Sequence, residues 1–347
     1  MNGRTARFAM LAAAATVLVA LGGCASGAAA PSANSSAGSG GALTPVSFSL
    51  NFTPSGAQAG FTYAKALGYY KDAGLDVTIQ PSTGSVATAQ LVASGGIDIG
   101  YTDAPSAFQI ASQGGDIKVV SPVLQTNGFA VISLADTGFT SLTDLKGKKV
   151  GLQPATGNAQ LFQSVLSQAG LSESDIQVVS VQPSALQAAL LGHQVDAIVT
   201  GGDTQVPLLE LAGNKLKYWM FYQVGVPTVG LSITASSKYI AAHPDVISKF
   251  TEASLRGWAE AQKNPSDAAQ SMVDQFPTSG TEQQVEAMLK VDLGLLCAAG
   301  GSTMGPVSDD VWSKTEQLLK DTQLLPANAD VTAYIDQKAA GSDFPAC

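Results

Sequence analysis

Arginine and histidine are scarce in this chain. Three arginines occur among its 347 residues, and two of them, Arg4 and Arg7, lie within the first 23. The two histidines, His193 and His243, stand far apart, and no Cys/His cluster has the spacing of a zinc site. Beyond residue 23 the chain carries 16 basic and 27 acidic side chains, a net charge of about −11. This charge balance argues against nucleic-acid binding. Because no metal-binding cluster occurs, no metal or other cofactor is expected.

Long apolar segments are also rare, because only residues 8–21 form an extended run without charge. That run is too short to span about 30 Å of hydrocarbon comfortably, and it follows a short positive region. An aliphatic residue and two glycines then precede Cys24, a pattern that resembles a bacterial lipobox. We therefore expect a lipoprotein signal peptide over residues 1–23, lipid on Cys24, and export to the outer face of the cell membrane. An ordinary signal peptide with an incidental cysteine is the alternative.

Small and polar residues dominate the segment that follows. Residues 25–42 consist of Ala, Ser, Gly, Asn and one Pro, without a large apolar side chain. Such a segment cannot bury enough apolar surface to offset the entropy lost on ordering. We expect residues 24–44 to act as a flexible linker between the lipid and a folded domain.

Two cysteines, Cys297 and Cys347, remain once Cys24 is assigned to lipid. An even pair in an oxidising compartment favours a disulfide, which would join the C-terminus to the body of the protein. Two unpaired thiols are the other interpretation.

From residue 44 onward, short apolar runs alternate with amphipathic stretches that end at glycine. Strands are expected at 46–52, 75–80, 97–101, 117–123, 129–134, 149–153, 176–181, 195–200, 216–224 and 228–234. Helices are expected between most of them, the first over 59–73, and a helical tail is expected after 234. This alternation is typical of right-handed βαβ units and parallel sheets covered on both faces. We expect an α/β fold of two lobes, each a mainly parallel sheet flanked by helices: residues 45–126 plus 231–347 form the first lobe and 127–230 the second. The helical tail is expected to pack on the first lobe.

Three blocks of sequence resemble a known family. They are residues 51–77, residues 84–100 with Leu-Val-Ala-Ser-Gly-Gly-Ile-Asp-Ile-Gly, and residues 141–151 with Ser-Leu-Thr-Asp-Leu-Lys-Gly-Lys-Lys-Val-Gly. Together they are similar to solute-binding proteins of ABC importers, in the branch that binds thiamine pyrimidines, sulfonates, taurine and nitrate. The resemblance implies a type II periplasmic-binding-protein fold, a monomer that closes on a small solute, and delivery to permease and ATPase subunits. It implies no catalysis, although a fungal pyrimidine-precursor synthase shares the fold and a sensory role is a further alternative.

Ligands of open parallel sheets bind beyond the carboxyl ends of the strands. Applied to the expected strands, this rule selects polar loops in both lobes and at the crossing between them. The candidate ligand-binding residues are Asn51, Phe52, Ser55, Gln58, Gly84, Ser85, Thr102, Asp103, Gln125, Asn127, Thr156, Gly157, Asn158, Gly202, Asp203 and Tyr222.

Several of these candidates have a purely structural alternative. Ser85 and Asn158 lie at the expected starts of helices, where free backbone amides could bind acceptor groups of a ligand. The alternative is that each serves only as a helix cap. Phe52 and Tyr222 could sandwich a planar ring, or Phe52 could pack in the core. Asp103 could accept from an amino group or cap the helix after it. Because no arginine lies in these loops, a pyrimidine-like or other heterocyclic solute is favoured over sulfonate, taurine or nitrate, which stay the alternative.

Overall fold

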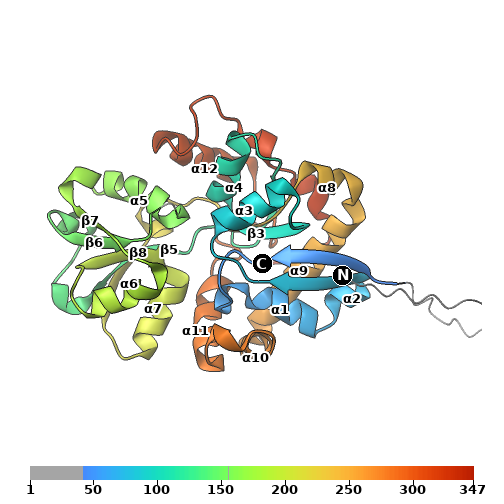
Figure 1. The fold of residues 1–347 in the computed structure, drawn as a ribbon, viewed down its shortest axis with the longest axis horizontal. Coiled ribbons are helices and arrows are strands. Elements are labelled where there is room, and N and C mark those ends of the chain that lie inside the picture. The colour runs from blue at the N-terminus through green and yellow to red at the C-terminus, as the bar shows by residue number, and fades with distance from the viewer. Residues whose placement is uncertain (1–41, 155) are drawn as a thin grey trace, which may run out of the picture. The chain divides into compact units, whose positions relative to one another are not determined.

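Two five-stranded sheets organise the chain (Figure 1). The computed structural model describes residues 42–154 and 156–347, so the expected signal peptide, Cys24 and nearly all of the linker lie outside the described residues. The first sheet has the order β2-β1-β3-β10-β4 and contains β1 (Thr44–Ser49), β2 (Leu75–Gln80), β3 (Ile99–Asp103), β4 (Lys118–Pro122) and β10 (Leu231–Ala235). The second has the order β7-β6-β8-β5-β9 and contains β5 (Phe129–Leu134), β6 (Lys149–Leu152), β7 (Gln177–Ser180), β8 (Ala197–Gly201) and β9 (Leu216–Met220).

In each sheet one strand runs against the other four. In the first sheet β10 pairs antiparallel with both β3 and β4, while β1 pairs parallel with β2 and β3. In the second sheet β5 pairs antiparallel with β8 and β9, while β6 pairs parallel with β7 and β8. The reversed strand is in each case the one that enters its sheet directly after the chain crosses from the other sheet. The expected α/β architecture of two mainly parallel sheets is confirmed.

Helices cover both faces of each sheet. The α-helices are α1 (Ala59–Ala66), α2 (Tyr69–Asp72), α3 (Ser85–Ser94), α4 (Ala104–Ser112), α5 (Gly157–Gln168), α6 (Pro183–Leu191), α7 (Gly202–Leu211), α8 (Ser237–Ala242), α9 (Pro244–Lys263), α10 (Pro265–Gln275), α11 (Glu282–Leu293) and α12 (Asp309–Asp321). Short 3₁₀ helices add η1 (Gly56–Gln58), η2 (Ala135–Thr137), η3 (Leu142–Leu145), η4 (Glu173–Asp175), η5 (Phe221–Val224), η6 (Pro277–Ser279), η7 (Val331–Tyr334) and η8 (Gln337–Ala340). We call the first sheet with the helices packed on it the first lobe, and the second sheet with α5, α6 and α7 the second lobe.

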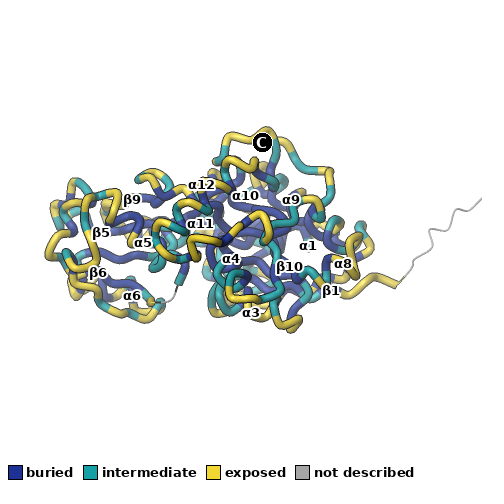
Figure 2. The backbone as a smooth tube through the Cα atoms, turned by 90° about the horizontal axis from the view of Figure 1, so that it is seen from above, coloured by how far each residue is buried: buried dark blue, intermediate teal, exposed yellow. Residues whose placement is uncertain are grey.

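Side-chain alternation along the strands explains this layering. Val131 on β5 packs in one apolar cluster with residues of α5, whereas its neighbours Ala130 and Ile132 pack in another with α6 and α7. Successive strand side chains point to opposite faces, so a continuous apolar run serves both. Figure 1 shows α5 on one side of this sheet and α6 and α7 on the other, and Figure 2 shows buried segments in the middle of each lobe.

An aromatic cluster fills the core of the first lobe. The rings of Phe48 and Phe250 lie 4.9 Å from each other, and Phe61 contacts Tyr101 at 4.7 Å and Trp258 at 5.8 Å. These rings lie between the sheet and the crossing of α1 with α9. At that crossing a Cβ added to Gly60 would lie 2.2 Å from the Trp258 ring, so glycine is required for the indole to pack.

The helical tail does not pack on the first lobe alone. Helices α9 and α10 lie against α1 as expected, but α11 also packs against α7, and α12 contacts α5. Both α5 and α7 belong to the second lobe. The tail therefore bridges the two lobes because its helices lie beside the contact between them, which corrects the expectation of a first-lobe tail.

Several element boundaries differ from the prediction, and three of the differences change the first helix or the setting of a candidate residue. The helix expected over 59–73 divides into α1 and α2 because Gly68 adopts a left-handed φ of 82°. The first strand ends at Ser49, so Phe52 lies in a loop. The strand expected over 216–224 ends at Met220, and Tyr222 lies in η5, which a left-handed Gly225 terminates.

Candidate functional site

The two lobes touch where the carboxyl ends of their strands meet. Asp103 is the last residue of β3 in the first lobe, and a Cβ added to Gly157 of the second lobe would lie 3.0 Å from its Oδ1. Nearby, Gln160 Nε2 of α5 donates to Gln109 Oε1 of α4 at 3.1 Å. We call this contact, with the buried polar groups around Tyr101 and Asp203, the interlobe site. The strand-end rule therefore brings candidate residues of both lobes together.

The loop after β1 is held by its own side chains. Gln58 is 1% exposed; its Oε1 accepts from the Ser55 backbone at 2.8 Å, and its Nε2 donates to Asn51 Oδ1 at 2.8 Å. Both ends of the Gln58 amide are thus occupied. Gln58 and Asn51 position η1 at the edge of the site, and Ser55 closes a capping box with Gln58.

Asp103 is the N-cap of α4. Its Oδ1 accepts from the Ser106 backbone N–H at 2.8 Å and its Oδ2 from the Ser106 hydroxyl at 2.9 Å. Ser85, which begins α3 after Gly84, accepts from the Asp103 backbone N–H at 3.1 Å. These bonds fix the Asp103 carboxylate at the lobe contact. The hydroxyl of the preceding residue, buried Thr102, has no hydrogen-bond partner.

The second lobe contributes the starts of two helices. Thr156 caps α5 and hydrogen-bonds Asn158, whose Nδ2 donates to the Val199 carbonyl at 3.3 Å. At α7, the backbone N–H groups of Gly202 and Asp203 both donate to the Gly128 carbonyl, at 2.8 and 3.1 Å. The Asp203 side chain is consequently directed by the first turn of α7 and is almost wholly buried.

The crossing residues hold the two lobe-connecting segments together. Asn127 Nδ2 donates to the Val226 carbonyl at 2.8 Å, and the Asn127 and Thr228 backbones pair at 3.0 Å. Gln125 binds the tail instead: its Nε2 donates to the Thr303 carbonyl at 3.0 Å and its Oε1 accepts from the Ala299 N–H at 3.2 Å. Both amide side chains are buried in these contacts, so they position the crossing.

Two aromatic candidates lie at the margins of the site. Phe52 is half-buried, and its carbonyl accepts from the Ser82 N–H at 3.2 Å. Tyr222 packs against apolar clusters that contain residues of the first and of the second lobe, and its hydroxyl accepts from Gln223 at 3.2 Å. That the two rings sandwich a ligand stays a prediction.

Asp292 is the principal site residue that sequence reasoning missed. It lies on α11 in line with Val285, Met288 and Leu289, the buried face of the helix, and it is 0% exposed. No N–H or hydroxyl of the described residues donates to either carboxyl oxygen, and the hydroxyl of fully buried Tyr101 has no hydrogen-bond partner. A carboxylate at the fourth position of an apolar helical stripe is the sequence signal that would have identified it.

Asp203, Asp292 and Tyr101 influence one another electrostatically. Burial raises the pKa of Asp203 to about 6. Burial, and then the neighbouring Asp203 charge, raises the pKa of Asp292 well above its usual range. Burial followed by the charges of Asp292 and Asp203 raises the pKa of Tyr101. The two carboxyls therefore retain protons to a higher pH than carboxyls in water do.

This pair predicts an unusual pH dependence of stability. The folded pKa values lie above the unfolded value, so between about pH 4 and 6 the folded protein holds more protons and its unfolding free energy falls as pH rises. We expect unliganded protein to be at least about 1 kcal/mol more stable at pH 5 than at pH 7.5. Urea unfolding at the two pH values measures this, and an Asp203→Asn, Asp292→Asn double variant should show a flatter profile. A wild-type profile that rises with pH over this range would contradict it.

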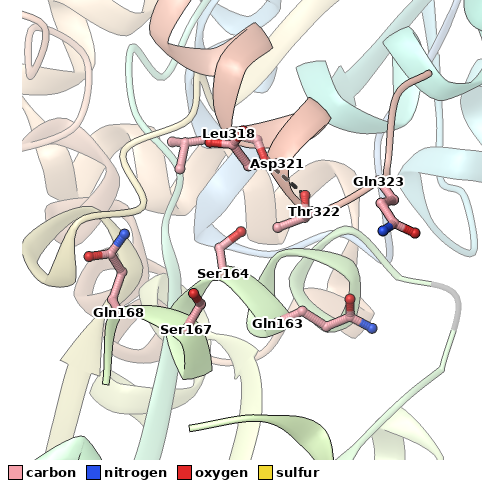
Figure 3. Close-up of a pocket in the computed structure, with 8 residues that line it drawn as sticks. All are labelled: Gln163, Ser164, Ser167, Gln168, Leu318, Asp321, Thr322 and Gln323. Carbon is pink, nitrogen blue, oxygen red and sulfur yellow. Dashed lines mark hydrogen bonds between the residues drawn. The ribbon is translucent and has the colours of Figure 1, made fainter. Parts of the chain in front are cut away.

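A polar groove lies apart from the predicted residues. A groove of about 320 Å³ separates α5 from the end of α12 and is lined by Gln163, Ser164, Ser167, Gln168, Leu318, Asp321, Thr322 and Gln323 (Figure 3). It contains none of the candidate residues. Its walls come from both lobes, so its width depends on how the lobes are arranged.

Comparison with known proteins identifies the family. The family model described as NMT1/THI5 like matches residues 56–268, more than half of the chain. The chain belongs to the NMT1/THI5-like family. It is 24% identical over 328 residues to the riboflavin-binding protein RibY of Chloroflexus aurantiacus, covering 91% of this chain and 92% of that protein. It is 27% identical over 229 residues to the formylaminopyrimidine-binding protein of Halalkalibacterium halodurans, covering 65% and 69%.

A solved structure confirms the fold. The periplasmic aliphatic sulphonate binding protein SsuA from Escherichia coli matches with a TM-score of 0.67 and 19% identity, over 86% of this chain and 99% of that one. The expected family and fold class are thus confirmed. Within the described residues, every helix is too short or too polar to cross a membrane.

Proposed function

We propose that this family member is the extracytoplasmic receptor of an ABC importer, which captures a small organic solute between its lobes and delivers it to the permease. The observation that carries this proposal is the paired crossing. Residues 123–128 and 224–231 run side by side, joined by backbone bonds from Asn127 to Thr228, from Gly230 to Leu124 and from Leu124 to Leu231. Two short paired segments can change their backbone angles while each lobe keeps its core, which is the design of a hinge.

The solute would lie at the interlobe site, bridging Asp103, Asp203 and the loop after β1. A ligand that contacts both lobes binds the closed arrangement better than the open one and so shifts the population toward closure. A heterocyclic solute is favoured, since riboflavin and formylaminopyrimidine name the ligands of two relatives. Sulfonate is the second candidate, favoured only by the fold shared with SsuA.

Lipid on Cys24 would keep this receptor near the permease. Residues 24–44 would then act as a leash that raises the effective concentration of one partner near the other. The protein would work as a monomer, on the outer face of the cell membrane. Changing Cys24 to Ser should release it without altering its affinity for solute.

The experiment combines ligand discovery with a variant that opposes closure. Native mass spectrometry of protein purified from its host, followed by thermal shift with pyrimidines, flavins, alkanesulfonates and nitrate, identifies a solute. X-ray scattering should then show compaction on binding. Gly157→Val places side-chain atoms against Asp103. It should lower the affinity for the solute at least ten-fold and prevent the compaction. Gly301→Val is the matched control, because a Cβ at this position would lie 3.7 Å from the nearest neighbouring atom, the Thr303 carbonyl oxygen. An unchanged radius with saturating ligand would refute closure.

A further inference from the structure

A buried acid whose polar neighbour is another acid is the least explained feature of the interlobe site. Asp292 places both carboxyl oxygens in a fully buried position where no N–H or hydroxyl of the described residues donates to them, and the carboxyl of Asp203 lies beside them. Such a group is costly unless something pairs with it. Because α11 packs directly against α7, the Asp292 side chain lies at the junction of the lobes beside Asp203. An acid retained on an apolar helix face at this place indicates a role other than packing.

In the part of the chain that the structure describes, no cation compensates this pair. Among the residues that the structure describes, the salt bridges involve neither Asp203 nor Asp292. Arg256, the sole arginine after residue 23, lies over the Tyr69 ring with Cζ 4.0 Å from its centroid. Because the pKa of Asp203 is about 6, the pair carries negative charge in a buried setting at neutral pH. A charge of this kind needs a counter-charge that the described residues do not supply.

The neighbouring groups define what such a counter-charge must look like. Tyr101 adds a buried hydroxyl without a partner, which can donate as well as accept. The η1 segment Gly56-Ala57-Gln58, which also packs on α11, has no titratable group, and no charge on α9 or α10 contributes to the pKa shift of Asp292. Asp203 and Tyr101 are thus the titratable groups that face it. The surroundings offer several acceptors and one donor, and they would repel an anion.

We propose that Asp292 and Asp203, with the Tyr101 hydroxyl, bind a cationic N–H donor of the solute, such as an amidinium, a protonated amine or a protonated amino-heterocycle. This inference rests on the proposed capture of a solute between the lobes and specifies its charge. The cation bridges a carboxylate from each side, so it stabilises the closed arrangement. The same site disfavours sulfonate and nitrate.

Binding of this cation is coupled to loss of a proton. The two carboxyls share one proton in the free site; an N–H cation takes its place, and the proton leaves to solvent. Affinity for the cation should therefore rise with pH from about pH 5 upward for as long as the free site holds that proton. Titration calorimetry in buffers of different ionisation enthalpy counts the proton released.

Three probes of one shape and different charge test the proposal. Benzamidinium is a cation with a forked pair of N–H donors, benzamide is neutral, and benzenesulfonate is an anion. Each is titrated to 10 mM against the intact mature protein by thermal shift and calorimetry. We expect benzamidinium alone to raise the melting temperature, and to bind Asp292→Asn and Asp203→Asn at least ten-fold more weakly. Asp76→Asn makes the same chemical change at an exposed position of β2 and should bind like wild type.

Several results would overturn the proposal. Benzamide could bind as tightly as benzamidinium, or benzenesulfonate could bind more tightly than benzamidinium. Benzamidinium could leave the melting temperature unchanged, or it could bind both aspartate variants as tightly as it binds wild type. Asn matches Asp in size, and each single variant tests the same pair, so the failure of one to fold leaves the other as the test. If the solute found by native mass spectrometry binds the variants as it binds wild type, this inference fails while capture stands. If the protein holds no solute and does not compact with any, capture itself fails.

Discussion

A Cys297→Ser, Cys347→Ser double variant should unfold with about 4 kcal/mol less free energy than the wild type. The two cysteines form a disulfide that closes a loop with a sequence separation of 50, as the cysteine pairing predicted. Closing a loop of that length removes conformations chiefly from the unfolded chain, and the entropy model gives about 4 kcal/mol. Equilibrium urea unfolding, with the slope held in common, measures the difference.

The same variant should also weaken the interlobe site. The C-terminal residues pair with the segment after α11: the Cys347 N–H donates to Ser302 O at 3.0 Å, and the Met304 N–H to Pro345 O at 2.9 Å. That segment holds Gln125 at the crossing through Thr303. Wild type treated with reductant is the matched control and should reproduce the loss. Equal stability with and without the bond would show that the tail is held by its other contacts alone.

Trp258→Ala should cost 3–5 kcal/mol of unfolding free energy, the range typical of a large aromatic removed from a core. Trp258 is fully buried, packs on Gly60 and meets the Phe61 ring edge-on. Its indole N–H has no hydrogen-bond partner, so the loss arises from volume and contacts rather than from a broken bond. Urea unfolding monitored by circular dichroism measures it.

Trp258→Phe serves as the control, because it keeps an aromatic ring while leaving a smaller void and should lose less than half as much. The change also tests how the site is supported. Phe61 lies between Trp258 and Tyr101, so a void behind it should loosen the ring that carries the site hydroxyl. A Trp258→Ala loss below about 1 kcal/mol would contradict the packing described for the crossing of α1 and α9.

Local signals were sufficient for much of the fold. Apolar runs bounded by glycine located the strands, and the restart of the pattern after residue 129 separated the two sheets. Where such signals failed, a single backbone position decided the outcome. Gly68 lies within an otherwise helical pattern and ends α1 because it takes a left-handed conformation, which periodicity cannot reveal. Sheet pairing of β5 and β10 likewise depends on contacts between distant segments.

For the site, sequence reasoning found the loops but not the roles of all their side chains. The strand-end rule brought Asp103, Gly157 and Asp203 to one place, because it follows from topology. It could not show that the side-chain amides of Gln58 and Asn127 are already hydrogen-bonded to the backbone and to neighbouring side chains. Nor could it show Asp292, since α11 comes from the tail and reaches the site only through tertiary packing.

The central claim is that a solute closes the two lobes on each other. The most direct measurement is the radius of gyration from X-ray scattering of the mature protein, with and without the solute that native mass spectrometry identifies. The account predicts a smaller radius with solute, and no such change in Gly157→Val at the same solute concentration. A radius that stays constant while calorimetry shows the site to be saturated would contradict it.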